Sequence, residues 1–155
     1  MKRPHDQFVN LLMSLAWAVL LAVIGGIGAP PDSAAENSTT CNVQNGSCLK
    51  ETSDGMTVEF DIQPKPVLSL SELAFSAILA RSGAPVTDAS VVLDLSMPGM
   101  YMGKNQPSLK FAKNGRYEWK GIIARCPSGS RIWQAELTII QGGKTTKVDF
   151  VFEVK

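Results

Sequence analysis

Three of the six methionines of this chain lie between Met97 and Gly103, on either side of a Pro98-Gly99 pair. A Pro-Gly pair is typical of an exposed turn, so we expect these thioethers to form a soft, uncharged sulfur surface on a loop. Soft sulfur ligands select Cu(I), and the spacing therefore indicates Met97, Met100 and Met102 as candidate Cu(I) ligands. The structural alternative is that Met97 ends a strand and caps the core, while Met100 and Met102 fill gaps over the open end of the domain.

Cys126 is the odd one among three cysteines. The simplest disulfide joins Cys41 to Cys48 around an Asn45-Gly46 turn, which leaves Cys126 as a free thiol. That thiol is then a further candidate ligand for the soft metal, a buried inert group, or the site of an inter-subunit bridge. A pairing of Cys126 with either N-terminal cysteine stays open, because spacing alone does not choose a partner. The turn at residues 127–131 could also hold an anion on its backbone amides, although ordinary turn chemistry explains these residues equally well.

The sole histidine, His5, lies in the first segment of the chain. The rest of the sequence therefore cannot assemble a Ser-His-Asp or Cys-His catalytic group, or a metal site that uses histidine. We expect a protein that is not an enzyme. The formal net charge is +1, and no run of lysines or arginines occurs. We therefore expect no nucleic-acid partner.

Residues 1–35 have the three-part layout of a secretory signal. Lys2 and Arg3 precede an apolar run from Phe8 to Ile27, and Ser33-Ala34-Ala35 supplies small residues for cleavage. An uncleaved membrane anchor is the alternative, since the apolar run approaches the ~20 residues of a membrane span. Under both readings the folded part is extracytoplasmic, either periplasmic or secreted. We expect the chain to meet a membrane only through an uncleaved N-terminal segment.

The domain organisation follows from a change in composition after this segment. Residues 36–55 are polar and carry Cys41 and Cys48, so we interpret them as a linker. From Met56 onward, apolar and polar residues alternate with period two, as in half-buried strands, and turn residues interrupt the alternation at intervals. We therefore predict a single β-sheet domain over residues 56–155.

The alternation predicts seven short strands. The segments between these strands are too short and too rich in turn residues to form a helix. This pattern favours an all-β, antiparallel, immunoglobulin-like β-sandwich, with an eight-stranded barrel as the alternative. The predicted strands are 56–63, 73–79, 89–97, 108–112, 116–123, 132–139 and 147–154. The expected core residues are Phe60, Phe75, Leu93, Tyr117, Trp119, Trp133, Leu137 and Phe150.

Strand parity makes a geometric prediction about the loops. If consecutive strands are antiparallel, successive loops alternate between the two ends of the domain. The loops at residues 64–70, 97–106 and 125–130 then share one end, which brings the methionines and Cys126 to the same side. The N-terminal segment with Cys41 and Cys48 is expected to enter from the opposite end.

Three short motifs in this order resemble the YtkA-like family, which is related to FixH. They are Met97-Pro98-Gly99-Met100, then Gly115-Arg116-Tyr117, then Gly129 followed by Trp133. The resemblance covers about Val58 to Leu137. It implies an extracytoplasmic immunoglobulin-like sandwich, found near copper and heavy-metal efflux or terminal-oxidase assembly systems. The added Cys41-x6-Cys48 segment lies outside the resemblance.

From these features we expect a non-catalytic, extracytoplasmic β-sandwich that binds a soft metal, Cu(I), through the methionine loop for carriage or delivery. Met100 and Met102 would be the main ligands, with Met97 and Cys126 as additions. The alternative is an interaction module that docks on a partner protein in a membrane complex. Methionine-rich surfaces are adaptable contact patches, so the same loop serves that function.

Overall fold

The computed structural model describes residues 42–100 and 102–155. The predicted signal or anchor at residues 1–35 and the candidate disulfide partner Cys41 lie outside them. All of the described strands belong to one unit, Ser38–Lys155. Within the described residues, no helix is long and apolar enough to cross a membrane.

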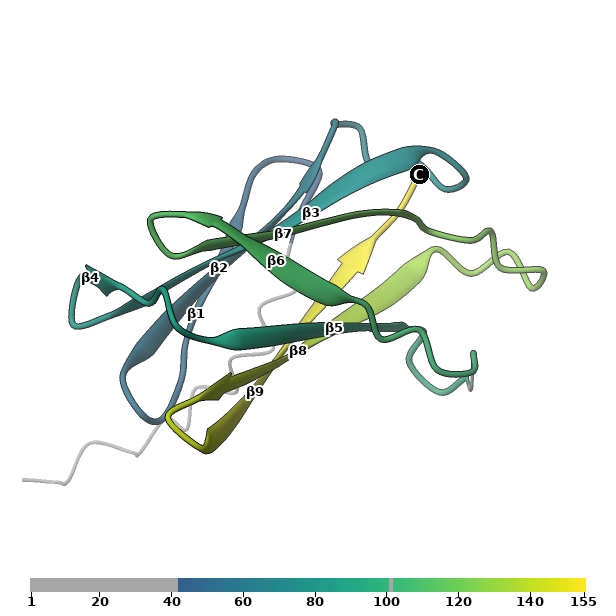
Figure 1. Ribbon diagram of the computed structural model, residues 1–155. Coiled ribbons are helices and arrows are strands. Elements are labelled where there is room, and N and C mark those ends of the chain that lie inside the picture. Colours follow the sequence, from purple (N-terminus) through teal and green to yellow (C-terminus); the bar gives the residue numbers. More distant parts are fainter. Residues whose placement is uncertain (1–41, 101) are drawn as a thin grey trace, which may run out of the picture. The chain divides into compact units, whose positions relative to one another are not determined.

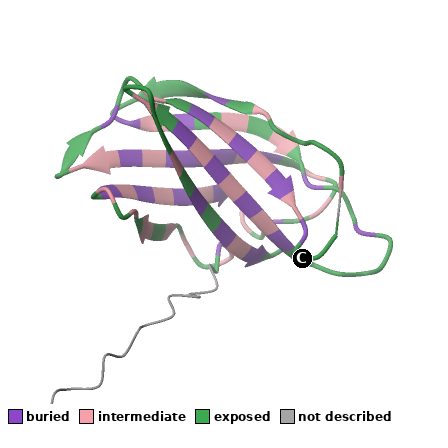
Figure 2. Cartoon of the chain, turned by 90° about the horizontal axis from the view of Figure 1, so that it is seen from below, coloured by how far each residue is buried: buried purple, intermediate pink, exposed green. Residues whose placement is uncertain are grey.

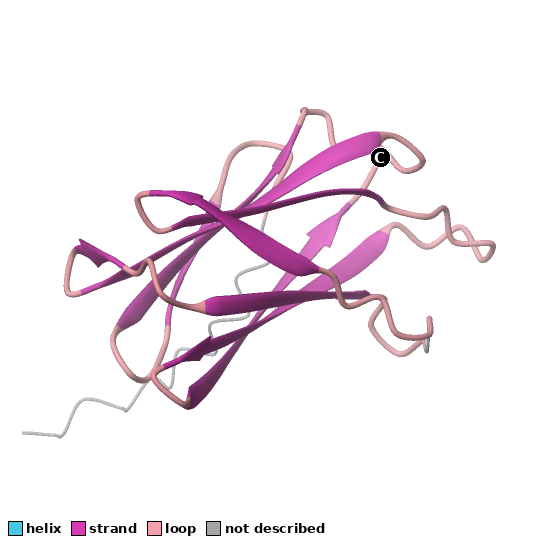
Figure 3. Cartoon of the chain, viewed as in Figure 1, coloured by secondary structure: helices cyan, strands magenta, loops and turns pink. Residues whose placement is uncertain are grey.

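Nine β-strands and no helix make up the described part of the chain (Figure 3). The strands are β1 (Cys48–Glu51), β2 (Met56–Gln63), β3 (Glu72–Arg81), β4 (Ala84–Pro85), β5 (Ser90–Ser96), β6 (Ser108–Lys113), β7 (Arg116–Ile122), β8 (Ile132–Gln141) and β9 (Lys144–Glu153). Every pair of neighbouring strands is antiparallel. The predicted all-β, antiparallel class is therefore confirmed. The number of strands differs from the predicted seven, because β1 and the two-residue β4 were not expected.

The strands form two layers, and β6 connects them (Figure 1). One layer has the order β1-β2-β3-β7-β6, with β4 at the end of β3, and the other has the order β5-β8-β9. β6 belongs to both layers, since Ser108 and Leu109 pair with β5 while Lys110 and Phe111 pair with β7. Among the described residues no ladder joins β1 to β9, so the strands do not close into a barrel.

The core lies between the two layers, and burial alternates along the long strands as the period-two pattern predicts (Figure 2). Phe60 of β2 stacks on Phe150 of β9 across the core, with ring centroids 5.0 Å apart. Seven of the eight predicted core residues are buried. The eighth, Trp119, is half-buried and packs against the core, where its ring lies 5.2 Å from that of Phe75.

Three connections lie at one end of the domain, which we call the loop end: the β2–β3 loop (residues 64–71), the β5–β6 loop (97–107) and the β7–β8 loop (123–131). The backbone N–H of Leu70 donates to the carbonyl of Ile123 over 2.8 Å, which joins the first loop to the third. Ser96, the last residue of β5, pairs with Gln134 near the start of β8, so the second loop leaves beside the third (Figure 1). The predicted meeting of these loops is confirmed.

The entry point of the chain contradicts the prediction made for it. β1 pairs antiparallel with β2, from Cys48 opposite Phe60 to Glu51 opposite Thr57. This unexpected strand adds one reversal of direction, so the segment before it lies at the loop end. There the side chain of Gln44 accepts from the N–H of Val67 over 2.9 Å. The expectation that the segment carrying Cys48 enters from the opposite end is therefore wrong.

Asp54, in the β1–β2 turn, holds the other end of the domain together. Its carboxylate accepts from the hydroxyl of Thr52 and forms ion pairs with Lys144 at 3.1 Å and Arg81 at 3.2 Å. The Thr52 hydrogen bond, followed by those from Lys144 and Arg81, holds the pKa of Asp54 far below its usual range, although burial opposes the shift. This carboxylate thus ties β1, β3 and the β8–β9 hairpin together.

Tyr117 is fully buried in β7 and connects the layers through its hydroxyl. That hydroxyl donates to the carbonyl of Val86 over 3.1 Å and accepts from the N–H of Ala89 over 3.1 Å. Both partners lie in the crossing segment between β4 and β5. Tyr117 therefore satisfies two backbone groups of a segment that runs from one layer to the other.

Candidate functional site

The methionine loop begins with a tight turn. The N–H of Met100 donates to the carbonyl of Met97 over 3.0 Å, and Gly99 between them has a φ of 76°. Pro at the second position and a positive-φ Gly at the third are typical of a type II turn. Because this turn reverses the chain directly after β5, Met97 keeps the inward orientation of the strand, whereas Met100 points away from the core.

The structure places the three methionines in different environments. Met97 is buried in the core, Met102 is half-buried and packs against the core, and Met100 is 43% exposed. The core position of Met97 agrees with the structural alternative for that residue. Tyr101, between the other two methionines, lies outside the described residues. The loop therefore offers one exposed thioether at Met100 and one at the edge of the core at Met102.

Cys126 lies in the β7–β8 loop with a free thiol and is only 4% exposed. It opens a turn in which the N–H of Gly129 donates to the carbonyl of Cys126 over 3.0 Å. The free thiol removes the alternative in which Cys126 is paired with Cys41 or Cys48. Cys48 is half-buried against the core. Because Cys41 lies outside the described residues, the disulfide between Cys41 and Cys48 stays a prediction.

The same turn surrounds the sulfur of Cys126 with hydrogen-bond donors. The hydroxyl oxygen of Ser128 lies 3.0 Å from the Cys126 Sγ. This hydroxyl, then the backbone N–H of Ser128 and that of Ser130, lower the pKa of the Cys126 thiol, while burial alone would raise it. The sequence left open whether the backbone amides of this turn hold an external anion or only form the turn. The amides of Ser128 and Ser130 instead lower the pKa of the chain's own thiol at Cys126, which favours the thiolate form that binds soft metals.

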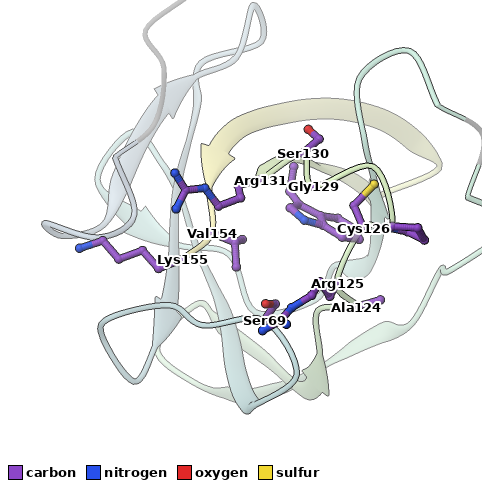
Figure 4. A pocket seen from close by; sticks show the side chains of 11 residues that line it. Ser69, Ala124, Arg125, Cys126, Gly129, Ser130, Arg131, Val154 and Lys155 are labelled. Atoms are coloured by element: carbon purple, nitrogen blue, oxygen red, sulfur yellow. The ribbon is translucent and has the colours of Figure 1, made fainter.

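Cys126 forms part of the wall of a pocket of about 510 Å³ at the loop end. Figure 4 shows Arg131 and Lys155 on one side of this pocket and Cys126 on the other. Cationic and apolar side chains line it, and no carboxylate side chain does. The lining residues are Ser69, Ala124, Arg125, Cys126, Pro127, Gly129, Ser130, Arg131, Trp133, Val154 and Lys155.

The four candidate sulfur ligands thus lie at one end of the domain, and three of them are packed against or within one core. Met97 directly follows Ser96, which pairs with Gln134, and the neighbouring Trp133 lines the pocket together with Cys126. The strand pairing therefore connects the methionine loop with the cysteine loop through β8. The described residues contain no group of three or more His, Cys, Asp or Glu side chains that could hold a metal ion.

Sequence reasoning missed the contact of Ser128 with the Cys126 sulfur, and it missed Arg125 as a candidate site residue. The proximity of Ser128 to Cys126 in the chain was visible, but its role depends on how the turn folds back on the sulfur. Arg125 precedes the cysteine and lines the same pocket. A signal for both was present in the sequence, as polar and cationic residues flanking an unpaired cysteine.

Comparisons with known proteins leave the family of this chain undefined. No protein-family model matches the sequence, and no curated protein matches it. Among solved structures, the crystal structure of the GAE domain of GGA2p from Saccharomyces cerevisiae aligns with 71% of this chain and 98% of that chain. The two share 16% sequence identity, with a TM-score of 0.36. Function is therefore inferred from the residues of this chain.

Proposed function

We propose that this protein is a non-catalytic, extracytoplasmic domain of immunoglobulin-like type that binds Cu(I) at its loop end. The strand order supports the fold assignment. The series β2-β3-β7-β6 and β5-β8-β9 corresponds, strand by strand, to the four-stranded and three-stranded sheets of an immunoglobulin constant-type domain. β1 then extends the first sheet at its edge.

The observation that carries the proposal is the free thiol of Cys126 at the same end as the methionine loop. Hydrogen bonds from Ser128 and Ser130 lower the pKa of this thiol, so its thiolate forms more readily than that of an ordinary cysteine. Thiolate and thioether ligands together select Cu(I) over harder ions. Cys126, Met100 and Met102 are the proposed ligands, and the buried Met97 is an additional thioether behind them.

The role that fits such a site is carriage of Cu(I), or its delivery to a membrane partner. The resemblance to the YtkA-like family supports this role, since that family is found near copper efflux and oxidase assembly systems. A ligand set with one exposed thioether, Met100, leaves the metal reachable from solvent. Reachability is what a carrier needs in order to hand its metal to a second protein.

The proposal is tested by titrating the reduced protein, residues 36–155, with Cu(I) against a chromophoric competitor. We expect stoichiometric binding tighter than micromolar that is lost in Cys126→Ser and strongly weakened in Met100→Leu/Met102→Leu. Met56→Leu is the matched control, because Met56 is buried near Arg81, away from the loop end, and should not affect binding. Absence of binding by the unaltered protein would overturn the proposal.

The second candidate function is docking on a partner protein in a membrane complex, with the methionine loop as the contact surface. The 43% exposure of Met100 favours it, because an apolar side chain in that position is available to a partner. Leucine preserves apolar contact area but removes the sulfur. Met100→Leu/Met102→Leu should therefore keep partner binding under this function and lose Cu(I) binding under the first.

A further inference from the structure

Exposed apolar side chains gather at the loop end. Of the eight large apolar side chains that are exposed in residues 42–100 and 102–155, five lie there: Leu68, Leu70, Met100, Ile122 and Ile132. Single exposed apolar residues are ordinary on protein surfaces, but a group on one face indicates an interaction site. This group extends beyond the residues proposed to bind copper.

Leu70 is the most exposed of the five, at 61%, and its backbone holds it outward. Its φ of 63° lies in the left-handed region that leucine rarely adopts. The hydrogen bond from its N–H to the carbonyl of Ile123 fixes this conformation and places it near Ile122, which is 56% exposed. The fold thus maintains a strained backbone in which a leucine side chain faces solvent.

The other apolar side chains come from different loops at the same end. Ile132 opens β8 opposite Glu153 of β9, and the nearby Lys155 accepts a backbone hydrogen bond from Ser69 of the β2–β3 loop. Met100 lies on the β5–β6 loop. Apolar side chains from two loops and from the adjoining ends of β7 and β8 are thus exposed at the same end of the domain.

Uncompensated positive charge surrounds this apolar group. Lys104 and Arg125 are exposed, and within the described part of the chain neither forms an ion pair. The two exposed carboxylates nearby are already matched, since Glu72 pairs with Lys120 at 3.8 Å and Glu153 pairs with Arg131 at 3.3 Å. The whole chain has a formal net charge of only +1, and these two unpaired cations place positive charge at the loop end.

We propose that the loop end docks on an anionic lipid surface. Aliphatic side chains at the tips would enter the boundary between headgroups and acyl chains, and the flanking cations would meet the lipid phosphates. An apolar group flanked by cations fits an anionic lipid surface, whereas the core of a protein interface is depleted in charged residues.

The course of the chain agrees with this orientation. Residue 42 enters the domain at the loop end, where Gln44 binds the backbone of Val67. The apolar run that the sequence places between Phe8 and Ile27 precedes this point by a short stretch of chain. If that run is an anchor, the chain leads from it into the loop end. If it is cleaved, the loop end provides membrane affinity by itself.

The test uses residues 38–155, which contain every described strand and the whole described core. The copper-free protein is sedimented with vesicles of phosphatidylcholine alone or mixed equally with phosphatidylglycerol. We expect binding to the mixed vesicles only, weakening as the salt concentration rises, because salt screens charge attraction to the surface. Equal binding to both vesicle types, or binding to neither type, would overturn the proposal. Binding to neither type would leave a protein partner as the occupant of the loop end.

Two variants and a matched control identify the surface. Leu70→Ser/Ile122→Ser and Lys104→Gln/Arg125→Gln should each weaken binding to the mixed vesicles at least tenfold. Leu49→Ser/Ile140→Ser removes two exposed aliphatic side chains elsewhere and should change this binding less than twofold. If the control weakens binding as much as the first variant, the proposal fails.

Thermal unfolding of each variant checks that the domain is intact. If the apolar variant does not fold, the charge variant decides, since its side chains lie outside the core. The lipid proposal does not depend on the copper site. Leu70→Ser/Ile122→Ser should therefore bind Cu(I) as the unaltered protein does, so that failure of one proposal is distinguishable from failure of the other.

Discussion

Replacement of Tyr117 by phenylalanine removes one oxygen atom from the interior and tests how the two layers are connected. The hydroxyl donates to the carbonyl of Val86 and accepts from the N–H of Ala89, both at 3.1 Å. The ring itself is retained, so the apolar burial changes little. The loss therefore concerns two backbone groups that become unpaired inside the domain.

Leaving a buried donor or acceptor unpaired costs about 1–3 kcal/mol. Since the two groups lie in one short segment that can relax, we expect Tyr117→Phe to lower the free energy of unfolding by about 2 kcal/mol. For a domain of this size the corresponding fall in Tm is about 8–12 °C. Urea unfolding followed by circular dichroism measures the free energy, and a thermal scan measures Tm.

Ser71→Ala is the matched control for this measurement. It also removes a hydroxyl that donates to a backbone carbonyl, that of Leu68 over 2.8 Å, but this hydrogen bond is exposed to solvent. Water replaces it, so the control should cost less than about 0.5 kcal/mol. If Tyr117→Phe is as mild as the control, the hydroxyl does not connect the layers in the way described.

Three further predictions follow from the contacts. Asp54→Asn should lower Tm at neutral pH, and the difference in Tm from the unaltered protein should disappear in acid. Because folding lowers the pKa of Asp54, this carboxylate stabilises the folded state above about pH 4. The stabilisation is lost as the pH falls through the pKa that Asp54 has in the folded state. Gly121→Ala should destabilise the domain by about 1–3 kcal/mol, since the added Cβ would lie 1.9 Å from the Trp119 ring, and tryptophan fluorescence should report the displaced ring; an unchanged spectrum and stability would contradict this. Alkylation of the thiol of Cys126 should show a pH midpoint below that of an ordinary cysteine, and Ser128→Ala should raise this midpoint; an identical profile in the variant would refute the role of that hydroxyl.

One strand, β2, was predicted from sequence with the right bounds, and the other predicted strands differ from the structure by one or more residues. β2 covers Met56–Gln63 as expected, because its apolar residues all face one core. β9 begins at Lys144, three residues before the predicted start. Gly142 and Gly143, with φ values of 56° and 79°, form a tight turn that lets pairing begin at once.

β1 was missed for a physical reason, and the error spread to the position of the N-terminal segment. As an edge strand it has no continuous apolar side, and Leu49 in its centre faces solvent. Period-two reasoning depends on a buried face and cannot find such a strand. The missing reversal then placed the chain entry at the wrong end.

The sequence predicted that the candidate ligands lie at one end of the domain, but it did not predict how their side chains are oriented. Strand parity placed the methionine loop and Cys126 at one end of the domain. This prediction was correct because it depends only on the number of main strands between the two loops. Whether a side chain points inward after a turn depends on backbone dihedrals that spacing does not specify. Met97 is therefore in the core while Met100 is exposed, and the donors around the Cys126 sulfur became visible only in three dimensions.

X-ray absorption at the copper edge, on protein loaded with Cu(I) and then desalted, tests the central claim most directly. The account predicts one retained copper with a first shell made of sulfur only, and loss of one sulfur neighbour in Cys126→Ser. A shell of nitrogen or oxygen atoms, or copper that does not survive desalting, would contradict a sulfur site at the loop end.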